Sequence, residues 1–157
     1  MKKLKILILI LFIQLAYANA QDNSNLYDIT ADPYQQLATA KIKAASENKN
    51  ILIQAGGNWC SWCRLFHKFS HENKKVDSIL TADYVVLHIN FSKENKNEKF
   101  FKEFKNPGRF GYPSFIVLNE KAELLHIQDS GYLEEGKGYS EEKVTRFLLL
   151  WNKYSTK

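Results

Sequence analysis

The chain has 157 residues, a length that predicts one domain with a single hydrophobic core. Its formal net charge is +5, from 22 basic and 17 acidic residues. Three of the lysines lie in the first twenty residues, and without that segment 19 basic residues face 17 acidic ones, a net charge of +2. A balance this slight argues against nucleic acid as a partner.

The first twenty residues have the three parts of a secretory signal peptide. Three lysines form a basic start, residues 6–17 are apolar apart from Gln14, and Ala18-Asn19-Ala20 is a small-x-small cleavage motif. The apolar run is shorter than the roughly 18–20 residues that a membrane-spanning helix needs. We therefore expect residues 1–20 to be cleaved, the protein to be exported to the periplasm or secreted, and no stable membrane insertion to remain.

Residues 21–31 are polar and predict an irregular lead. The pair Asp32-Pro33 then predicts the start of a helix, because Asp can cap it and the missing N–H of Pro costs nothing at the first helical position. The run Ile51 to Ala55 is mostly apolar, as expected of a strand buried on both faces of a sheet. The apolar stripe of the preceding helix is predicted to comprise Tyr34, Leu37, Ala38, Ile42 and Ala45.

The only two cysteines of the sequence, Cys60 and Cys63, lie where that strand turns into the next helix. Residues three apart on a helix share a face, so the two sulfurs can come close enough to bond. At a helix N-terminus the unpaired N–H groups and the macrodipole favour an anion, here the thiolate that attacks a disulfide. Since the sequence offers no other cysteine for a structural disulfide, we interpret the pair as a redox-active centre.

The rest of the chain alternates strand and helix patterns. The order of elements places an α/β crossover first and a hairpin second, which predicts an α/β fold with a mixed sheet covered by helices on both faces. The helix after the cysteines is predicted to bury Trp62, Leu65, Phe66 and Phe69. Strands are predicted over residues 84–91, 114–118 and 123–128, a helical turn over 76–80, helices over 98–105 and 140–154, and a glycine-containing loop over 130–138.

The segment Trp59-Cys60-Ser61-Trp62-Cys63, between a strand and a helix, and Tyr112-Pro113, at the start of a later strand, resemble the thioredoxin superfamily. The resemblance covers roughly residues 33–154. It is similar to exported thioredoxin-like proteins, including the C-terminal reductase domain of the bacterial envelope disulfide-transfer system. This implies a thioredoxin-like domain over residues 32–157, with a central mixed sheet of four strands, or five, flanked by helices.

The resemblance also implies a role for each residue of the site. Cys60 would be the attacking thiolate and Cys63 the buried resolving thiol, which makes them the catalytic pair. Pro113 would follow a cis peptide bond opposite the dithiol. No metal or organic cofactor is needed, since the dithiol itself carries the electrons. The residues implied to bind substrate are Trp59, Tyr112, Pro113 and Gly131.

Of three departures from the family pattern, Lys68 replaces a mid-helix proline and the other two bear on the redox chemistry. Gln54 stands where thioredoxins have a buried carboxylate that moves protons for the resolving thiol, and an amide cannot titrate. The dipeptide Ser61-Trp62 lacks the histidine of the strong envelope oxidant, which favours reduction of substrates over their oxidation. We therefore expect an exported thiol–disulfide oxidoreductase that reduces protein or peptide disulfides and takes electrons from another thiol protein.

The same residues leave other interpretations open. The protein could be a disulfide oxidase or isomerase, or a peptide-binding module or chaperone in which the dithiol is incidental. Zinc binding by both cysteines with His67 and His71 is excluded on a continuous helix, because Cys60 and His71 would lie roughly 16 Å apart along its axis. Acidic residues interrupt the lysine-rich segment 93–109, which indicates a solvated helix face rather than a nucleic-acid site.

Overall fold

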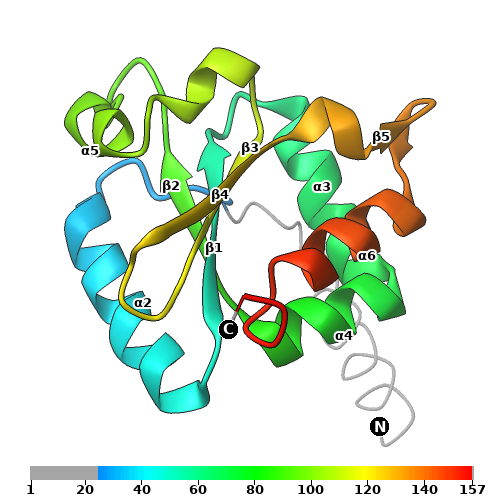
Figure 1. Ribbon diagram of the computed structural model, residues 1–157. Helices are drawn as coiled ribbons and strands as arrows, with labels where there is room; N and C mark the ends of the chain where they lie inside the picture. The colour runs from blue at the N-terminus through cyan, green and yellow to red at the C-terminus, as the bar shows by residue number, and fades with distance from the viewer. Residues whose placement is uncertain (1–24, 157) are drawn as a thin grey trace, which may run out of the picture.

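The strand β1 (Asn50–Gly56) lies in the middle of the sheet, and all seven of its residues are buried. In this computed structural model, which describes residues 25–156, β1 pairs in parallel with β2 (Tyr84–Asn90) and antiparallel with β3 (Ser114–Leu118). β3 also pairs antiparallel with β4 (Leu124–Asp129), which gives the strand order β2-β1-β3-β4 (Figure 1). The predicted mixed α/β sheet is confirmed, with four strands in the described part of the chain.

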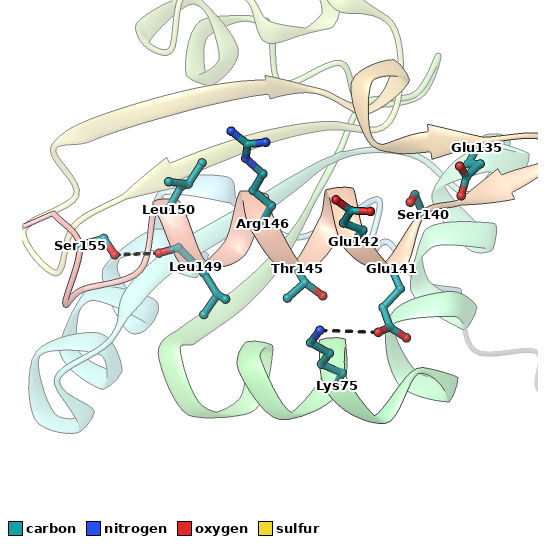
Figure 2. Close-up of a pocket in the computed structure, with 10 residues that line it drawn as sticks. All are labelled: Lys75, Glu135, Ser140, Glu141, Glu142, Thr145, Arg146, Leu149, Leu150 and Ser155. Carbon is teal, nitrogen blue, oxygen red and sulfur yellow. Dashed lines mark hydrogen bonds and ion pairs between the residues drawn. The ribbon is translucent and has the colours of Figure 1, made fainter.

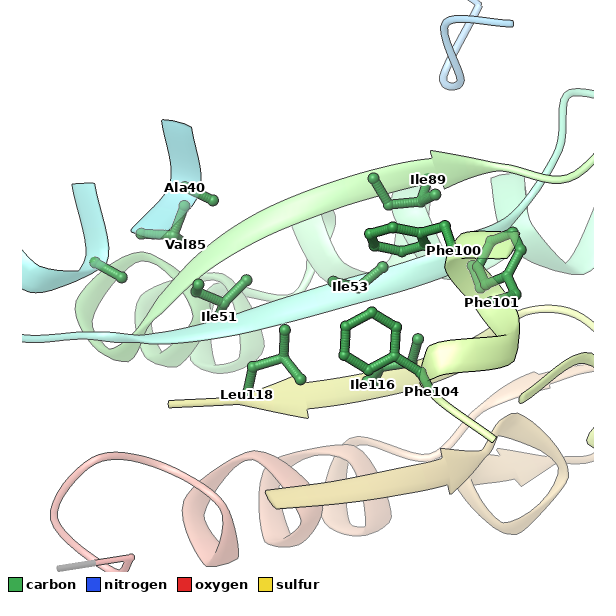
Figure 3. Close-up of a cluster of buried hydrophobic side chains, with 12 residues drawn as sticks. Ala40, Ile51, Ile53, Val85, Ile89, Phe100, Phe101, Phe104, Ile116 and Leu118 are labelled. Carbon is green, nitrogen blue, oxygen red and sulfur yellow. The ribbon is translucent and has the colours of Figure 1, made fainter. Parts of the chain in front are cut away.

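Alternate residues of the central strands pack on opposite faces of the sheet, as the two-residue period of a strand requires. On one face Ile51, Ile53 and Ile116 belong to a buried cluster that α2 (Pro33–Glu47) and α5 (Glu98–Glu103) cover (Figure 3). Three aromatic side chains from α5 and its C-terminal end complete this cluster. They are Phe100, Phe101 and Phe104.

The opposite face of the sheet carries Leu52 and Phe115. It is covered by α3 (Ser61–Glu72), α4 (Lys74–Asp83) and α6 (Glu141–Leu150), which lie together on one side of the sheet in Figure 1. The apolar face predicted for the helix after the cysteines packs here, as do Val144, Phe147 and Leu148 of α6. The sheet is thus buried between two helical layers, which explains why β1 and β3 are apolar throughout most of their length.

The apolar stripe predicted for α2 is wrong except at Leu37. Ile42 is 75% exposed, and the buried residues of the helix are Pro33, Ala40 and Ala44, with Leu37 packed beside them. Both sets fit a helical period, so the spacing alone allowed either face to be buried. The short side chains of the alanines let the helix lie close to the sheet, and this close packing selects the face without the larger Ile42.

Two helices have different bounds from those predicted. α4 is a full helix rather than a single turn, because the side chain of Asn73 caps it by accepting the N–H groups of Lys75 and Val76, each at 3.1 Å. α6 ends at Leu150 instead of continuing through Tyr154. Beyond that end the side chain of Asn152 accepts the Tyr154 N–H at 3.1 Å, a local turn that replaces the helical hydrogen bonds.

The glycine-containing loop predicted over residues 130–138 has more structure than expected. It begins with the 3-10 helix η2 (Ser130–Leu133). A small hairpin follows, in which β5 (Glu134–Glu135) pairs antiparallel with β6 (Gly138–Tyr139). Gly136 adopts a φ of +60° in the turn between them, a conformation that glycine reaches without steric cost.

The predicted signal peptide, residues 1–20, and the first residues of the predicted lead lie outside the described residues. The remainder of that lead, residues 25–31, contains no helix or strand. Among residues 25–156, no helix is both long enough and apolar enough to cross a lipid bilayer.

Truncation of Ile116 tests the packing of the first cluster. Its side chain is fully buried, so Ile116→Ala is expected to lower the free energy of unfolding by about 2–5 kcal/mol through lost burial and the cavity left behind. Ile42→Ala, at the exposed position on α2, is the matched control and should change it by no more than about 0.5 kcal/mol. Equilibrium denaturation with urea measures both, and equal losses would contradict the assigned faces.

Candidate active site

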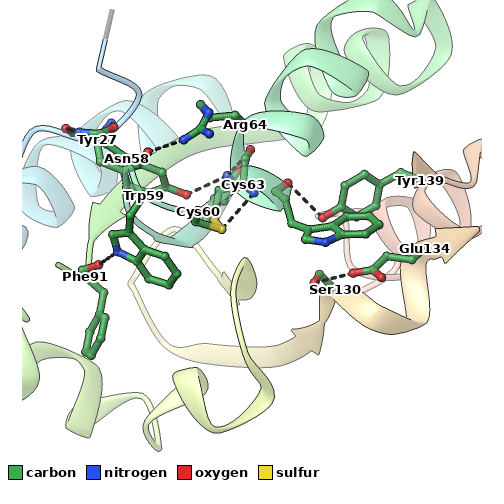
Figure 4. The surroundings of a disulfide bond; sticks show 12 residues. Tyr27, Asn58, Trp59, Cys60, Cys63, Arg64, Phe91, Ser130, Glu134 and Tyr139 are labelled. Carbon is green, nitrogen blue, oxygen red and sulfur yellow. Dashed lines mark hydrogen bonds between the residues drawn. A yellow bond between two sulfur atoms is a disulfide. The ribbon is translucent and has the colours of Figure 1, made fainter. Parts of the chain in front are cut away.

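Cys60 and Cys63 form a disulfide where β1 leads into α3, with their Cα atoms 5.2 Å apart (Figure 4). Cys60 is the N-cap of α3, and its sulfur accepts the Cys63 backbone N–H at 3.1 Å. That N–H is one of the donors that the first turn of a helix leaves without a backbone partner. The geometry therefore stabilises negative charge on Cys60 Sγ when the disulfide opens.

The two cysteines differ in solvent access. Cys60 is 4% exposed and Cys63 is fully buried, while Ser61 between them is exposed. Cys63 is buried as the family resemblance implies, but Cys60, which attack on a substrate requires to be accessible, is almost fully buried as well. A disulfide partner that approaches from solvent meets Cys60 first, because Cys63 has no exposed surface.

An aromatic rim borders the disulfide. Trp59 is 58% exposed, and its Nε1–H donates to the Phe91 carbonyl at 2.7 Å, which holds the indole beside the turn. The ring of Tyr112 meets Trp59 edge-on at 5.6 Å between centroids and stacks on Phe91 at 5.0 Å. Tyr112 also packs against the buried cysteine cluster, and its peptide bond to Pro113 is cis, as the family resemblance implies.

Gly131 lies in η2, directly after β4. Its N–H donates to the Asp129 side chain at 2.8 Å, which closes the turn into η2. Its neighbour Ser130 lies among the residues that surround the disulfide in Figure 4. The structure thus brings Trp59 and Tyr112 into the rim of the disulfide, whereas a role for Gly131 in a substrate groove stays a prediction.

The sequence analysis missed Tyr27, which comes from the irregular lead. Its side chain is fully buried against both cysteines. The Asn58 side chain holds its backbone at two points, accepting the Tyr27 N–H at 3.0 Å and donating to the Tyr27 carbonyl at 2.8 Å. The Arg64 guanidinium in turn donates to the Asn58 carbonyl. The signal available in the sequence was the apolar pair Leu26-Tyr27 within an otherwise polar stretch.

Gln54 lies beneath the disulfide and is 1% exposed. Its amide Nε2 donates to the Tyr27 hydroxyl at 2.8 Å and to the Cys63 carbonyl at 3.1 Å. The amide thus links the lead to the start of α3 at the position where thioredoxins have a carboxylate. Gly56 is needed nearby, since a Cβ there would lie 2.5 Å from Cys63 Sγ and 2.6 Å from the Tyr27 hydroxyl oxygen.

Three histidines lie near Tyr27, with the His88 ring in contact with the Tyr27 ring. The His67 ring is 4.2 Å from that of His71 and 5.6 Å from that of His88, measured between centroids. Burial, reinforced by the other two histidines, lowers the pKa of His88 to about 4. Within residues 25–156 no group of three or more His, Cys, Asp or Glu side chains is placed to hold a metal ion.

Two surface grooves differ in their relation to the disulfide. One, of about 770 Å³, borders Trp59 and is lined also by Ile29, Phe91 and Lys93. The other, of about 810 Å³, lies along α6 and includes the ion pair between Lys75 and Glu141 (Figure 2). The first groove adjoins the aromatic rim, whereas neither cysteine nor any rim residue lines the second.

A sequence profile of the thioredoxin-like family matches residues 32–120, more than half of the chain. The chain therefore belongs to the thioredoxin-like family.

Two curated proteins are similar over part of their length. The thiol:disulfide interchange protein DsbD of Actinobacillus pleuropneumoniae is 28% identical over 103 residues, which cover 64% of this chain and 17% of that protein. Human spermatogenesis-associated protein 20 is 27% identical over 62 residues, 40% of this chain and 8% of that protein. The chain thus matches less than a fifth of the length of these relatives.

Two solved structures share the fold. A disulphide isomerase from Xylella fastidiosa Temecula1 superimposes with a TM-score of 0.68 at 24% identity, covering 78% of this chain and 93% of that one. The oxidised C-terminal domain of DsbD from Neisseria meningitidis gives a TM-score of 0.56 at 14% identity, covering 80% and 100%. Both superpositions show that the chain has the same fold as these domains.

Because His88 is buried in its neutral form, the free energy of unfolding should fall when the protein is acidified. Its folded pKa of about 4 lies below the ordinary 6.5, so the unfolded chain binds the proton more tightly. The stability from this group is complete above pH 6.5 and is lost as the pH falls towards 4, by on the order of 3 kcal/mol. Urea denaturation at neutral and acidic pH should show a smaller loss in His88→Gln than in the wild type. An equal loss would contradict this assignment.

Proposed function

We propose that the protein is an exported thiol–disulfide oxidoreductase that reduces disulfides in proteins or peptides. The observation that carries the proposal is the hydrogen bond from the Cys63 N–H to Cys60 Sγ at the start of α3. It favours a thiolate on the cysteine that retains some exposed surface, and the fully buried partner is one helical turn away. These are the properties required of an attacking thiol and a resolving thiol.

The proposed reaction proceeds through a mixed disulfide. In the reduced protein the Cys60 thiolate attacks one sulfur of the substrate disulfide, a Cys60–substrate bond forms, and the other substrate sulfur leaves as a thiolate and takes up a proton. Cys63 then attacks Cys60 Sγ, which closes the internal disulfide and releases the second substrate thiol. Two electrons pass to the substrate, and a donor dithiol protein must restore the Cys60 and Cys63 thiols. No organic cofactor takes part.

The aromatic rim suits an extended polypeptide. Trp59 and Tyr112 present ring surface beside the disulfide, and the groove along Trp59 continues this surface past Phe91. Apolar ring surface of this kind binds side chains with little sequence preference. We infer that Trp59, Tyr112, Pro113 and Gly131 contact the substrate chain on either side of its cysteine.

The compartment is proposed from the N-terminal sequence. The basic, apolar and small-residue parts of residues 1–20 form an export signal, and export places the dithiol where protein disulfides occur. We therefore place the protein in the periplasm or outside the cell.

Replacement of each cysteine separates the two proposed roles. Cys60→Ser should reduce the catalysed reduction of insulin disulfides to the background rate, because the attacking sulfur is gone. Cys63→Ser keeps that sulfur and should accumulate mixed disulfides with the substrate, visible by mass spectrometry and released by dithiothreitol. Wild-type turnover by both variants would overturn the mechanism and favour a peptide-binding role.

The direction of electron flow follows from the reduction potential. The dipeptide Ser61-Trp62 offers no cationic side chain to stabilise the thiolate further, so a reducing centre is expected. Equilibration with glutathione and dithiothreitol buffers should give a potential nearer to the roughly −270 mV of thioredoxin than to the roughly −120 mV of a strong oxidant. A potential at or above about −180 mV, typical of a disulfide isomerase, would instead favour the oxidase or isomerase alternative.

A further inference from the structure

The hydroxyl group of Tyr27 lies beside the sulfur of Cys63 in the protein interior. Both residues are fully buried. A Cβ placed on Gly56 would lie 2.6 Å from the Tyr27 hydroxyl oxygen and 2.5 Å from Cys63 Sγ, so both atoms lie close to that point. Tyr27 is therefore a polar neighbour of the resolving cysteine contributed by the N-terminal segment.

The hydrogen bond from Gln54 leaves the hydrogen of the Tyr27 hydroxyl available. In this bond, 2.8 Å long, the amide Nε2 is the donor and the hydroxyl oxygen is the acceptor. A phenol can also donate its own hydroxyl hydrogen. In the disulfide form, no residue among 25–156 accepts a hydrogen bond from the Tyr27 hydroxyl. When the disulfide opens, Cys63 Sγ becomes an acceptor at this position, and a thiolate accepts more strongly than a disulfide sulfur.

Two features keep the phenol in place and protonated. The backbone of Tyr27 is held at both its N–H and its carbonyl by the Asn58 side chain, and its ring meets His88 edge-on at 5.6 Å between centroids. Burial raises the pKa of Tyr27 well above its ordinary value, so the hydroxyl remains a neutral donor throughout the working range of pH. His88 itself remains neutral above pH 6.5, since burial lowers its pKa to about 4.

We propose that Tyr27 is a positioning residue for the redox reaction, whose hydroxyl donates a hydrogen bond to Cys63 Sγ once the disulfide is open and so favours the Cys63 thiolate. The inference rests on the proposed function, in which that thiolate attacks Cys60 of the mixed disulfide. The Cys60–Cys63 bond then forms, the Cys60–substrate bond breaks, and the departing substrate sulfur takes up the proton that Cys63 has lost.

This arrangement replaces a proton carrier with a hydrogen-bond donor. The amide of Gln54 cannot accept the proton of Cys63, but it orients the Tyr27 hydroxyl while also binding the Cys63 carbonyl. The predicted cleavage after Ala20 would leave Tyr27 in the mature chain. The segment before α2 thus completes the site instead of serving only as a lead.

The test uses Tyr27→Phe in the Cys60→Ser background, where Cys63 is the only cysteine and cannot form the internal disulfide. Phe keeps the ring and removes only the hydroxyl group. The pKa of Cys63, followed through its Cβ resonance by NMR of cysteine-labelled protein, is expected to rise by about one unit, a tenfold increase in proton affinity. Tyr84→Phe is the matched control, because Tyr84 is also buried but lies outside the cysteine cluster, and its hydroxyl donates to the Leu148 carbonyl of α6.

A second measurement uses protein with both cysteines. Tyr27→Phe should slow the closure of the mixed disulfide by about threefold, because the tenfold smaller thiolate fraction is partly offset by the greater nucleophilicity of a more basic thiolate. Trapped substrate should then accumulate in single-turnover experiments, whereas with Tyr84→Phe it should not. Circular dichroism and urea denaturation verify that each variant folds. Should Tyr27→Phe not fold, Raman difference spectra of oxidised and reduced wild-type protein labelled at tyrosine report whether a buried phenol becomes a hydrogen-bond donor on reduction.

The outcomes distinguish this inference from the proposed function. An unchanged pKa of Cys63 in Tyr27→Phe, an equal shift in Tyr84→Phe, or no new phenol donor on reduction would each overturn the role of Tyr27. Failure of the wild-type protein to reduce any disulfide would overturn the proposed function. The pKa measurement needs no substrate and is unaffected by that second result.

Discussion

The hydrogen bond from the Cys63 N–H to Cys60 Sγ depends on α3 beginning at Cys60, and the redox chemistry depends on that bond. The start of the helix is set by β1, which is buried on both faces and ends at Gly56, just before the turn that leads into α3. Packing of two helical layers holds β1 in place. The distant apolar clusters therefore support the site by keeping one backbone donor aimed at one sulfur.

Close packing around Cys63 gives the two sulfurs their different environments. Gly56 has no side chain, so the sulfur of Cys63 and the hydroxyl of Tyr27 can approach the strand together. Gln54 Nε2 donates to the Tyr27 hydroxyl and to the Cys63 carbonyl, so its amide hydrogens are paired without a buried charge. Cys60 keeps 4% of its surface exposed, whereas Cys63 is fully buried. The two cysteines of one turn thus differ in solvent access.

Much of the fold follows from local patterns. The apolar runs of β1, β2 and β3 and the Asp32-Pro33 helix start were readable because burial and capping act on neighbouring residues. The buried face of α2 could not be predicted, since two sets of residues both fit a helical period. Only contact with the sheet selects the set that contains Ala40 and Ala44. The full length of α4 and the end of α6 depend on the single side chains of Asn73 and Asn152.

For the active site, the residues along the chain were sufficient to place a dithiol at the start of a helix, because strand, turn and helix signals are contiguous there. The resemblance to thioredoxins added Tyr112 and Pro113, which lie about fifty residues away along the chain. Tyr27 could not be assigned in this way. Its position beside Cys63 results from contacts with Gln54 and Asn58 across 27 and 31 residues of sequence. Such contacts form only when the sheet and α3 have created the space that the phenol fills.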